Sequence, residues 1–146
     1  MRGAGSKMKL LEQVPMFSAC THAELRHVAA VTQPVTAEAG EVIAKEGEPG
    51  KDFFVIIQGN TDVVIDGRTV AELGPGDFFG EMALLDQSPR VGSVVAKGPT
   101  SLYRIEARDF SRLIDEVPFL GKKLLRGLAL RIRQTEKAPQ YVWNRM

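Results

Sequence analysis

Two side chains of opposite charge, Glu81 and Arg90, lie in one segment of the chain and together could bind a small phosphorylated ligand. An ionised carboxylate only accepts hydrogen bonds, whereas a guanidinium can hold a phosphate through two parallel hydrogen bonds. Residues 81–85 are good helix formers, and Gly80 would let a backbone approach the start of that helix, where exposed N–H groups attract anions. The set suits a ligand with hydroxyl and phosphate groups. A surface ion pair, which adds little stability, explains the same two residues equally well.

A helical segment is expected ahead of these residues, at about residues 8–30. Pro15 should divide it into two helices, because proline interrupts the hydrogen bonding of a helix. Thr21 and Glu24 have the spacing of a capping box, which predicts a helix start near Thr21. Apolar residues recur there at helical spacings, at Leu10, Leu11, Val14, Phe17, Leu25, Val28 and Ala29.

Residues 34–107, which include Glu81 and Arg90, predict a series of short strands. The segment is dense in Val, Ile, Phe and Thr and is interrupted by glycine and proline turn signals. Asp66-Gly67 lies between two apolar runs and predicts a two-residue hairpin, since both central positions of a type I′ turn need positive φ. Short strands at even spacing favour a closed antiparallel sandwich or barrel, with the jelly roll among the candidates.

The C-terminal part of the chain predicts helices again. A short helix carries Phe110 and Leu113, ends at Val117-Pro118, and is followed by a second helix over about residues 119–137. Basic residues surround the second helix at Lys122, Lys123, Arg126, Arg131 and Arg133. A solvated basic face is the simpler interpretation, and ligand or membrane contact is the alternative. Residues 1–9 and the tail 138–146 are expected to be loosely held, which leaves 10–137 as one domain.

The composition excludes several classes of protein. The 146 residues fit one folded domain, and a formal net charge of +1 provides no basic field for nucleic acid. The apolar run at 53–57 is far shorter than the ~20 residues of a membrane span, and no signal peptide is evident. A cytoplasmic location is the expectation by default. Cys20, the single cysteine, has no partner for a disulfide or at metal-ligand spacing and is expected to be structural.

The segment from Phe79 to Val94 resembles the phosphate-binding cassette of the cyclic nucleotide-binding domain family. The family pattern is Phe-Gly-Glu-(Leu/Met/Ile)-(Ala/Ser/Cys)-Leu, a short loop, and Pro-Arg-(Ala/Ser/Thr)-Ala-(Thr/Ser)-Val. The chain has Phe-Gly-Glu-Met-Ala-Leu and Pro-Arg-Val-Gly-Ser-Val. The resemblance extends over about residues 10–135, with further matches at 11–17, 40–43, 46–48, 52–56, 59 and 73–78. It implies a mainly β fold with flanking helices: an eight-stranded antiparallel jelly roll with N-terminal helices, a short cassette helix and C-terminal helices.

The resemblance also implies roles for individual residues. Glu81 would bind the ribose 2′-hydroxyl, Gly80 would approach the ribose, and Arg90 would bind the cyclic phosphate. The N–H groups of Ala83 and Val91 would complete the phosphate site.

The base would then lie between a strand and the final helix. Val63 and Ile65, with Met82, would line its pocket, although a plain core role is equally open for Ile65. Arg131 is the residue of the final helix expected to stack on the base, and an ordinary surface role is its alternative.

Two positions depart from the family pattern and bear on ligand choice. Val91 replaces a small or hydroxylated residue, and the absence of a hydroxyl removes a contact typical of members that select cGMP. The expected ligand is therefore cAMP, with cGMP possible, and no cofactor or metal is expected. Gly92 replaces the usual alanine and is expected to add backbone freedom to the binding loop.

The sequence thus predicts a non-enzymatic, ligand-dependent sensor whose C-terminal helix moves on binding. A protein partner or a missing effector domain would read that movement, and a stand-alone bacterial sensor and an excised fragment both remain open. A degenerate domain that serves as a protein interaction module is the alternative. A metal-dependent cupin enzyme is disfavoured, because such sites need strand-borne imidazoles and His22 and His27 lie in the N-terminal helical zone.

Overall fold

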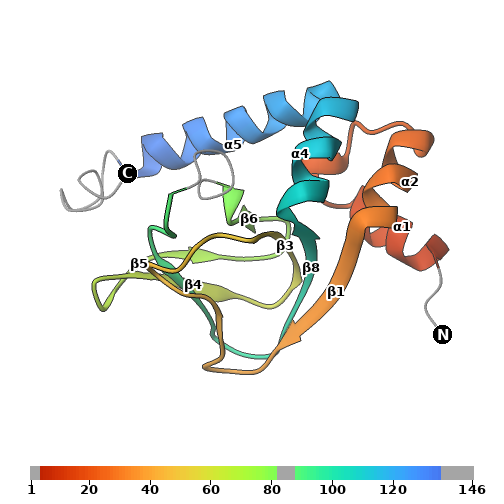
Figure 1. The fold of residues 1–146 in the computed structure, drawn as a ribbon. Coiled ribbons are helices and arrows are strands. Elements are labelled where there is room, and N and C mark those ends of the chain that lie inside the picture. The colour runs from red at the N-terminus through yellow and green to blue at the C-terminus, as the bar shows by residue number, and fades with distance from the viewer. Residues whose placement is uncertain (1–3, 82–87, 136–146) are drawn as a thin grey trace.

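The computed structural model describes residues 4–81 and 88–135, with side chains for 7–81, 88–126 and 129. The described strands form two antiparallel sheets of four strands each (Figure 1). In the first sheet the order is β1 (Thr32–Ala37), β8 (Thr100–Glu106), β3 (Asp52–Gln58) and β6 (Phe78–Phe79). In the second it is β2 (Val42–Ala44), β7 (Ser93–Ala96), β4 (Thr61–Ile65) and β5 (Arg68–Leu73). The predicted eight-stranded jelly roll is confirmed.

The helices flank the sandwich on one side, with α5 extending across its end (Figure 1). They are α1 (Ala4–Glu12), the 3-10 turn η1 (Pro15–Phe17), α2 (His22–Val31), α4 (Ala107–Glu116) and α5 (Pro118–Thr135). The predicted capping box of α2 is present, because the Glu24 N–H donates to Thr21 Oγ1 at 3.1 Å and the Thr21 N–H donates to Glu24 Oε1 at 2.8 Å. Pro118 is the first residue of α5, where its missing N–H costs no helical hydrogen bond.

The first helix begins earlier than the sequence pattern indicates. Residues from Ala4 onward are helical, although residues 1–9 were expected to be loosely held. Lys7 provides the physical reason: its Nζ donates to the carbonyls of Ala29 and Thr32 at 3.0 and 2.9 Å, near the end of α2. The same ammonium lies 5.9 Å from the centre of the Tyr103 ring, within range of a cation–π contact. The tail expected at 138–146 lies outside the described residues.

Two hydrophobic clusters share the strand β3, whose residues are buried on both faces. Phe53 and Val55 belong to the cluster under the helices, where the Phe53 ring stacks on Phe110 with centroids 4.6 Å apart. Phe54 and Ile56 belong to the cluster between the two sheets. The uninterrupted apolar run of β3 follows from this two-sided burial, since successive side chains of a strand point to opposite faces.

The hairpin predicted at Asp66-Gly67 is confirmed. Ile65 pairs with Arg68, and the two residues between them have φ of 52° and 76°, as a type I′ turn requires. The hairpin sets the register of β4 beside β5, and the other edge of β4 pairs with β7.

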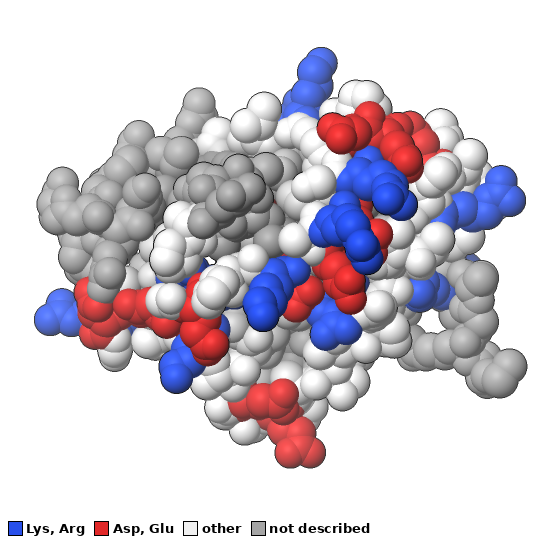
Figure 2. Space-filling model, viewed as in Figure 1, with Lys and Arg blue, Asp and Glu red and all other residues white. Residues whose placement is uncertain are grey.

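The surface carries both signs of charge. On the face shown in Figure 2, acidic and basic side chains are interspersed and no single basic field is visible. Among the described residues, none of the helices is long and apolar enough to cross a membrane.

Candidate functional site

The first half of the site is placed by β6, a strand of only two residues. Phe79 pairs with Phe54 of β3, and their rings stack with centroids 4.9 Å apart. This contact holds Gly80 and Glu81, the next two residues, beside the start of β3. Glu81 is buried with 1% of its surface exposed, although carboxylates are rarely buried without compensation.

Gly80 is required by the close approach of two segments. Its φ is +96°, a conformation that disfavours a side chain. A Cβ at this position would lie 2.5 Å from the Asp52 carbonyl oxygen and 3.2 Å from Arg90 Nη1. Glycine therefore brings the backbone against the guanidinium, whereas the sequence analysis predicted only its approach to the helix start and the ribose.

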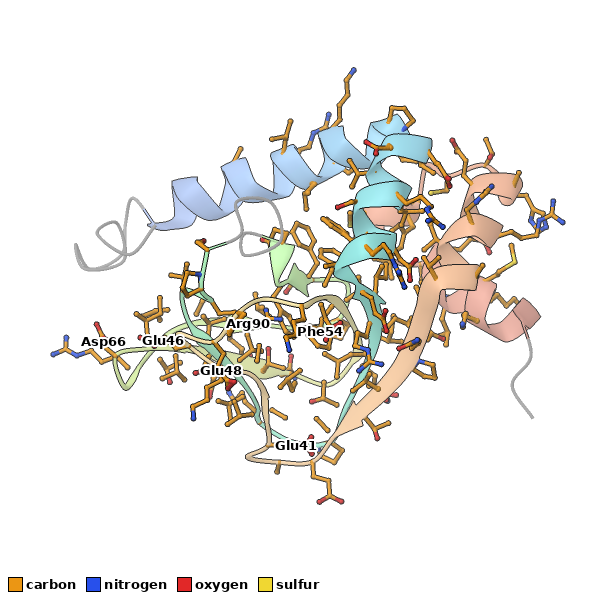
Figure 3. All side chains as sticks on the ribbon, viewed as in Figure 1. Glu41, Glu46, Glu48, Phe54, Asp66 and Arg90 are labelled. Carbon is orange, nitrogen blue, oxygen red and sulfur yellow. The ribbon has the colours of Figure 1, made fainter. Side chains whose placement is uncertain are left out.

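Arg90 is held through both its backbone and its side chain. Its N–H donates to the Glu48 carbonyl at 2.9 Å, and its own carbonyl accepts from the Gly47 N–H at 2.9 Å. Its Nη2 donates to the Asp52 carbonyl at 3.2 Å. Two of these contacts come from the loop that joins β2 to β3, and the third comes from Asp52, the first residue of β3. They hold the half-buried guanidinium of Arg90, labelled in Figure 3, beside Gly80.

The electrostatic environment of Arg90 distinguishes it from a surface arginine. Burial lowers the pKa of its guanidinium, whereas the nearby carboxylates of Asp52, Glu48 and Glu81 act to raise that pKa. Arginine stays charged in either case. A positive group that is partly removed from water beside a buried carboxylate is unlike an exposed surface ion pair, so that interpretation of Glu81 and Arg90 does not fit the structure.

The strand β4 approaches the same segment from the other side, at Gly92. A Cβ on Gly92 would lie 2.9 Å from Ile65 Cγ1, 3.1 Å from the Val64 carbonyl oxygen and 3.4 Å from Val63 Cγ1. Glycine at position 92 is thus explained by the lack of space for a side chain, because its absence allows the loop to pack closely on β4. The sequence pattern had indicated only added backbone freedom at this position. Ile65 is buried and Val63 is half-buried at this contact.

Most of the residues singled out from the sequence are close together in the fold. Gly80, Glu81 and Arg90 lie at the start of β3, and Val63 and Ile65 of β4 contact the position two residues after Arg90. Val91 lies between these two groups and is half-buried. Met82, Ala83 and the side chain of Arg131 lie outside the described residues.

Three contributors to the site were missed by sequence reasoning. Gly47, Glu48 and Asp52 hold Arg90 by backbone N–H and carbonyl groups, as given above. Backbone groups occur in every residue, so no side-chain type in the sequence indicates which residues will hold Arg90. Residues 46–48 and 52–56 were recognised only as matches to the family pattern, with no role at the site.

Other groups capable of chemistry lie away from this site. His22 and His27 are on α2, where His27 Nδ1 lies 3.5 Å from a carboxylate oxygen of Glu116, so neither imidazole is borne by a strand as a cupin site would need. Burial, and then the charge of Glu24, raise the pKa of the Cys20 thiol to about 11, which leaves it protonated and weakly nucleophilic at neutral pH. Within residues 4–81 and 88–135, no three His, Cys, Asp or Glu side chains are grouped to hold a metal ion.

Comparison with known proteins identifies relatives of this chain in both sequence and fold. Residues 34–117 match the family described as "Cyclic nucleotide-binding domain". A cAMP-dependent protein kinase regulatory subunit of Emericella nidulans is 36% identical over 109 residues, which is 73% of this chain and 26% of that protein. A cyclic nucleotide-gated potassium channel of Mesorhizobium japonicum is 35% identical over 125 residues, which is 86% of this chain and 34% of that protein.

A solved structure described as "Sp-2Cl-cAMPS bound to PKAR CBD2" has the same fold. It superposes with a TM-score of 0.78 at 26% identity, covering 93% of this chain and 94% of that chain. The chain therefore spans about a quarter to a third of the length of the two curated relatives and nearly all of this solved domain.

We expect Gly92→Ala to lower the free energy of unfolding by about 1–3 kcal/mol, because the added methyl group must displace Ile65 or the Val64 carbonyl. Urea denaturation followed by circular dichroism measures this change. Gly98→Ala is the matched control, since a Cβ there would have no heavy atom of the described residues within 4 Å, and it should leave stability equal or raise it by up to about 1 kcal/mol. Equal stability of the two variants would contradict close packing at Gly92.

Proposed function

Since this chain belongs to the cyclic nucleotide-binding domain family, we propose that it binds a cyclic nucleotide, with cAMP preferred, and acts as a ligand-dependent regulatory sensor. The observation that carries this proposal is the placement of buried Glu81 and half-buried Arg90 next to Gly80, with β4 close by. A carboxylate acceptor and a guanidinium donor match the hydroxyl and phosphate groups of one small ligand.

The proposed contacts divide the ligand between the two sides of the site. Arg90 binds the cyclic phosphate, together with the N–H groups of Ala83 and Val91, and Glu81 accepts from the ribose 2′-hydroxyl. Val63 and Ile65, with Met82, line the base pocket. Support comes from partial desolvation of Arg90, since a guanidinium that has already lost part of its hydration binds a phosphate with less further loss of water.

The proposed regulatory role depends on α5. Its first turns are anchored, because Leu120 and Leu124 are buried in the cluster that contains Phe53 and Phe110. We assign the sensing movement to the later part of this helix, with Arg131 stacking on the base. A protein partner or a further domain would detect the movement, as part of a longer protein or as a separate chain.

Removal of the Arg90 side chain should weaken cyclic nucleotide binding strongly while leaving the fold intact. Arg90→Ala is expected to weaken cAMP binding by about 30-fold to several thousand-fold, because the loss of one partner of a buried charge pair costs about 2–5 kcal/mol. Calorimetric titration measures the affinity, and circular dichroism checks folding. The control Arg26→Ala removes the same charge from the exposed side of α2 and should bind like the wild type. Undiminished binding by Arg90→Ala would remove Arg90 from the site, and a wild-type chain that binds no cyclic nucleotide would favour the interaction-module alternative.

Selectivity should follow the side chain at position 91. The wild type is expected to bind cAMP more tightly than cGMP, because Val91 offers no hydroxyl to guanine. Val91→Thr should narrow the difference by supplying one neutral hydrogen bond, about 0.5–1.5 kcal/mol. Competition titrations with both nucleotides measure the ratio of the cAMP and cGMP affinities. Val91→Ala, which also lacks a hydroxyl, should leave this ratio at the wild-type value or higher. A wild type that prefers cGMP would refute the argument.

Movement of α5 should be visible in the emission of Trp143, the only tryptophan. We expect cAMP to change this emission in a saturable way, and Arg131→Ala to raise the midpoint, because stacking of the guanidinium on the base would be lost. Arg126→Ala, an exposed arginine on the same helix, is the control and should leave the midpoint in place. Calorimetric binding with constant emission would contradict the movement, and an unshifted midpoint in Arg131→Ala would exclude this residue.

A further inference from the structure

The position of Arg90 depends on a loop, residues 45–51, that joins β2 to β3. Gly47 and Glu48 exchange two backbone hydrogen bonds with Arg90, each 2.9 Å long. The pairing continues only as an isolated bridge between Pro49 and Pro89, and the regular strand β7 does not begin until Ser93. Arg90 therefore lies outside the ladders of both sheets, and the backbone of Arg90 is held by this loop.

Glu46 connects the loop to two other segments. Its N–H donates to Ser93 Oγ at 2.9 Å, which fixes the loop to the first residue of β7. Its side-chain oxygen Oε1 accepts from the Asp66 N–H at 3.1 Å, across 20 positions of the sequence. The backbone of Glu46 is thus bonded to β7, which pairs with β4 at Ser93 and Val64, and its carboxylate is bonded to the turn at the end of β4.

Asp66 is the first residue of the turn that ends β4, the strand carrying Val63 and Ile65. Figure 3 shows Glu46 next to Asp66 at the hairpin end of the sandwich, with Glu48 and Arg90 further along toward its middle. The carboxylate of Glu46 therefore joins the loop that holds the arginine to the hairpin that carries the apolar wall.

We propose that Glu46 is a positioning residue, which sets the distance between Arg90 and the β4 wall by bonding the loop to the turn at Asp66. This role deepens the proposed function and rests on it, because the two sides would hold the phosphate and the base of one nucleotide. A site whose two halves are fixed before the ligand arrives loses less conformational entropy on binding. Glu46 does not touch the ligand in this scheme, and it acts through Gly47, Glu48 and Arg90.

The first test needs no ligand and measures amide hydrogen exchange by NMR in the free protein. In Glu46→Ala the Asp66 N–H loses its acceptor and should exchange faster. If Glu46 positions the arginine, the Arg90 N–H should also exchange about 2- to 10-fold faster, corresponding to one lost hydrogen bond. Faster exchange at Asp66 with unchanged exchange at Arg90 would overturn the proposal and reduce Glu46 to a cap on the hairpin.

The second test measures cAMP affinity by calorimetry. Glu46→Ala should weaken binding by about 2- to 10-fold, and Glu46→Gln, which keeps a side-chain oxygen acceptor, should recover most of that loss. Equal affinity of Glu46→Ala and the wild type would overturn the proposal. A wild type that fails to bind cAMP would overturn the proposed function instead, while the exchange of the Arg90 amide would still decide whether Glu46 positions this residue.

Glu41 provides a matched control on the same scaffold. Its Oε1 accepts the Glu38 N–H at 3.1 Å in the turn between β1 and β2, a bond of the same type and length. Figure 3 shows Glu41 apart from Glu46 and Arg90. Glu41→Ala should speed exchange at Glu38 while leaving both the Arg90 amide and the cAMP affinity at their wild-type values. If Glu41→Ala weakened binding as much as Glu46→Ala, the effect would reflect lost negative charge and the proposal would fall.

Discussion

The structure depends on the burial of β3 on both of its faces. Phe53 and Val55 pack under the helices, whereas Phe54 and Ile56 pack between the sheets. The same strand stacks Phe54 on Phe79, which precedes Gly80 and Glu81, and its first carbonyl accepts from Arg90. Because a packed strand with two covered faces has little room to shift, one element fixes both the helical layer and the site.

The site contains buried charge, which is costly in free energy, together with neighbouring groups that offset this cost. Glu81 is almost fully removed from water, and burial also opposes the charged form of Arg90. Such groups are stabilised by each other's charge and by fixed backbone dipoles, here including the Asp52 carbonyl. Surface charges elsewhere, such as Lys97 with Glu72, remain exposed and contribute little to stability. The concentration of partly dehydrated charge at one place separates the candidate site from the rest of the surface.

Sequence reasoning succeeded where the determinants are local. The capping box at Thr21 and Glu24, the turn at Asp66-Gly67 and the apolar run of β3 each follow from spacing within a few residues, and the family pattern located Glu81 and Arg90. It did not reach features that depend on distant neighbours. The early start of α1 depends on Lys7 bonding carbonyls 22 and 25 positions away, and the need for glycine at position 92 depends on Ile65. Backbone acceptors such as the Asp52 carbonyl have no sequence signature at all.

The strand order of the first sheet has a consequence for how the chain acquires its structure. β8 lies between β1 and β3, so neither strand can form its hydrogen bonds with β8 until residues 100–106 are present. Gln33 and Arg104, which hydrogen-bond across β1 and β8, are 71 positions apart. Contacts of such long range slow folding, because a large loop must close before any pairing is gained. During synthesis on the ribosome, the apolar run of β3 therefore emerges well before its central partner and stays exposed to aggregation or chaperone binding until β8 arrives.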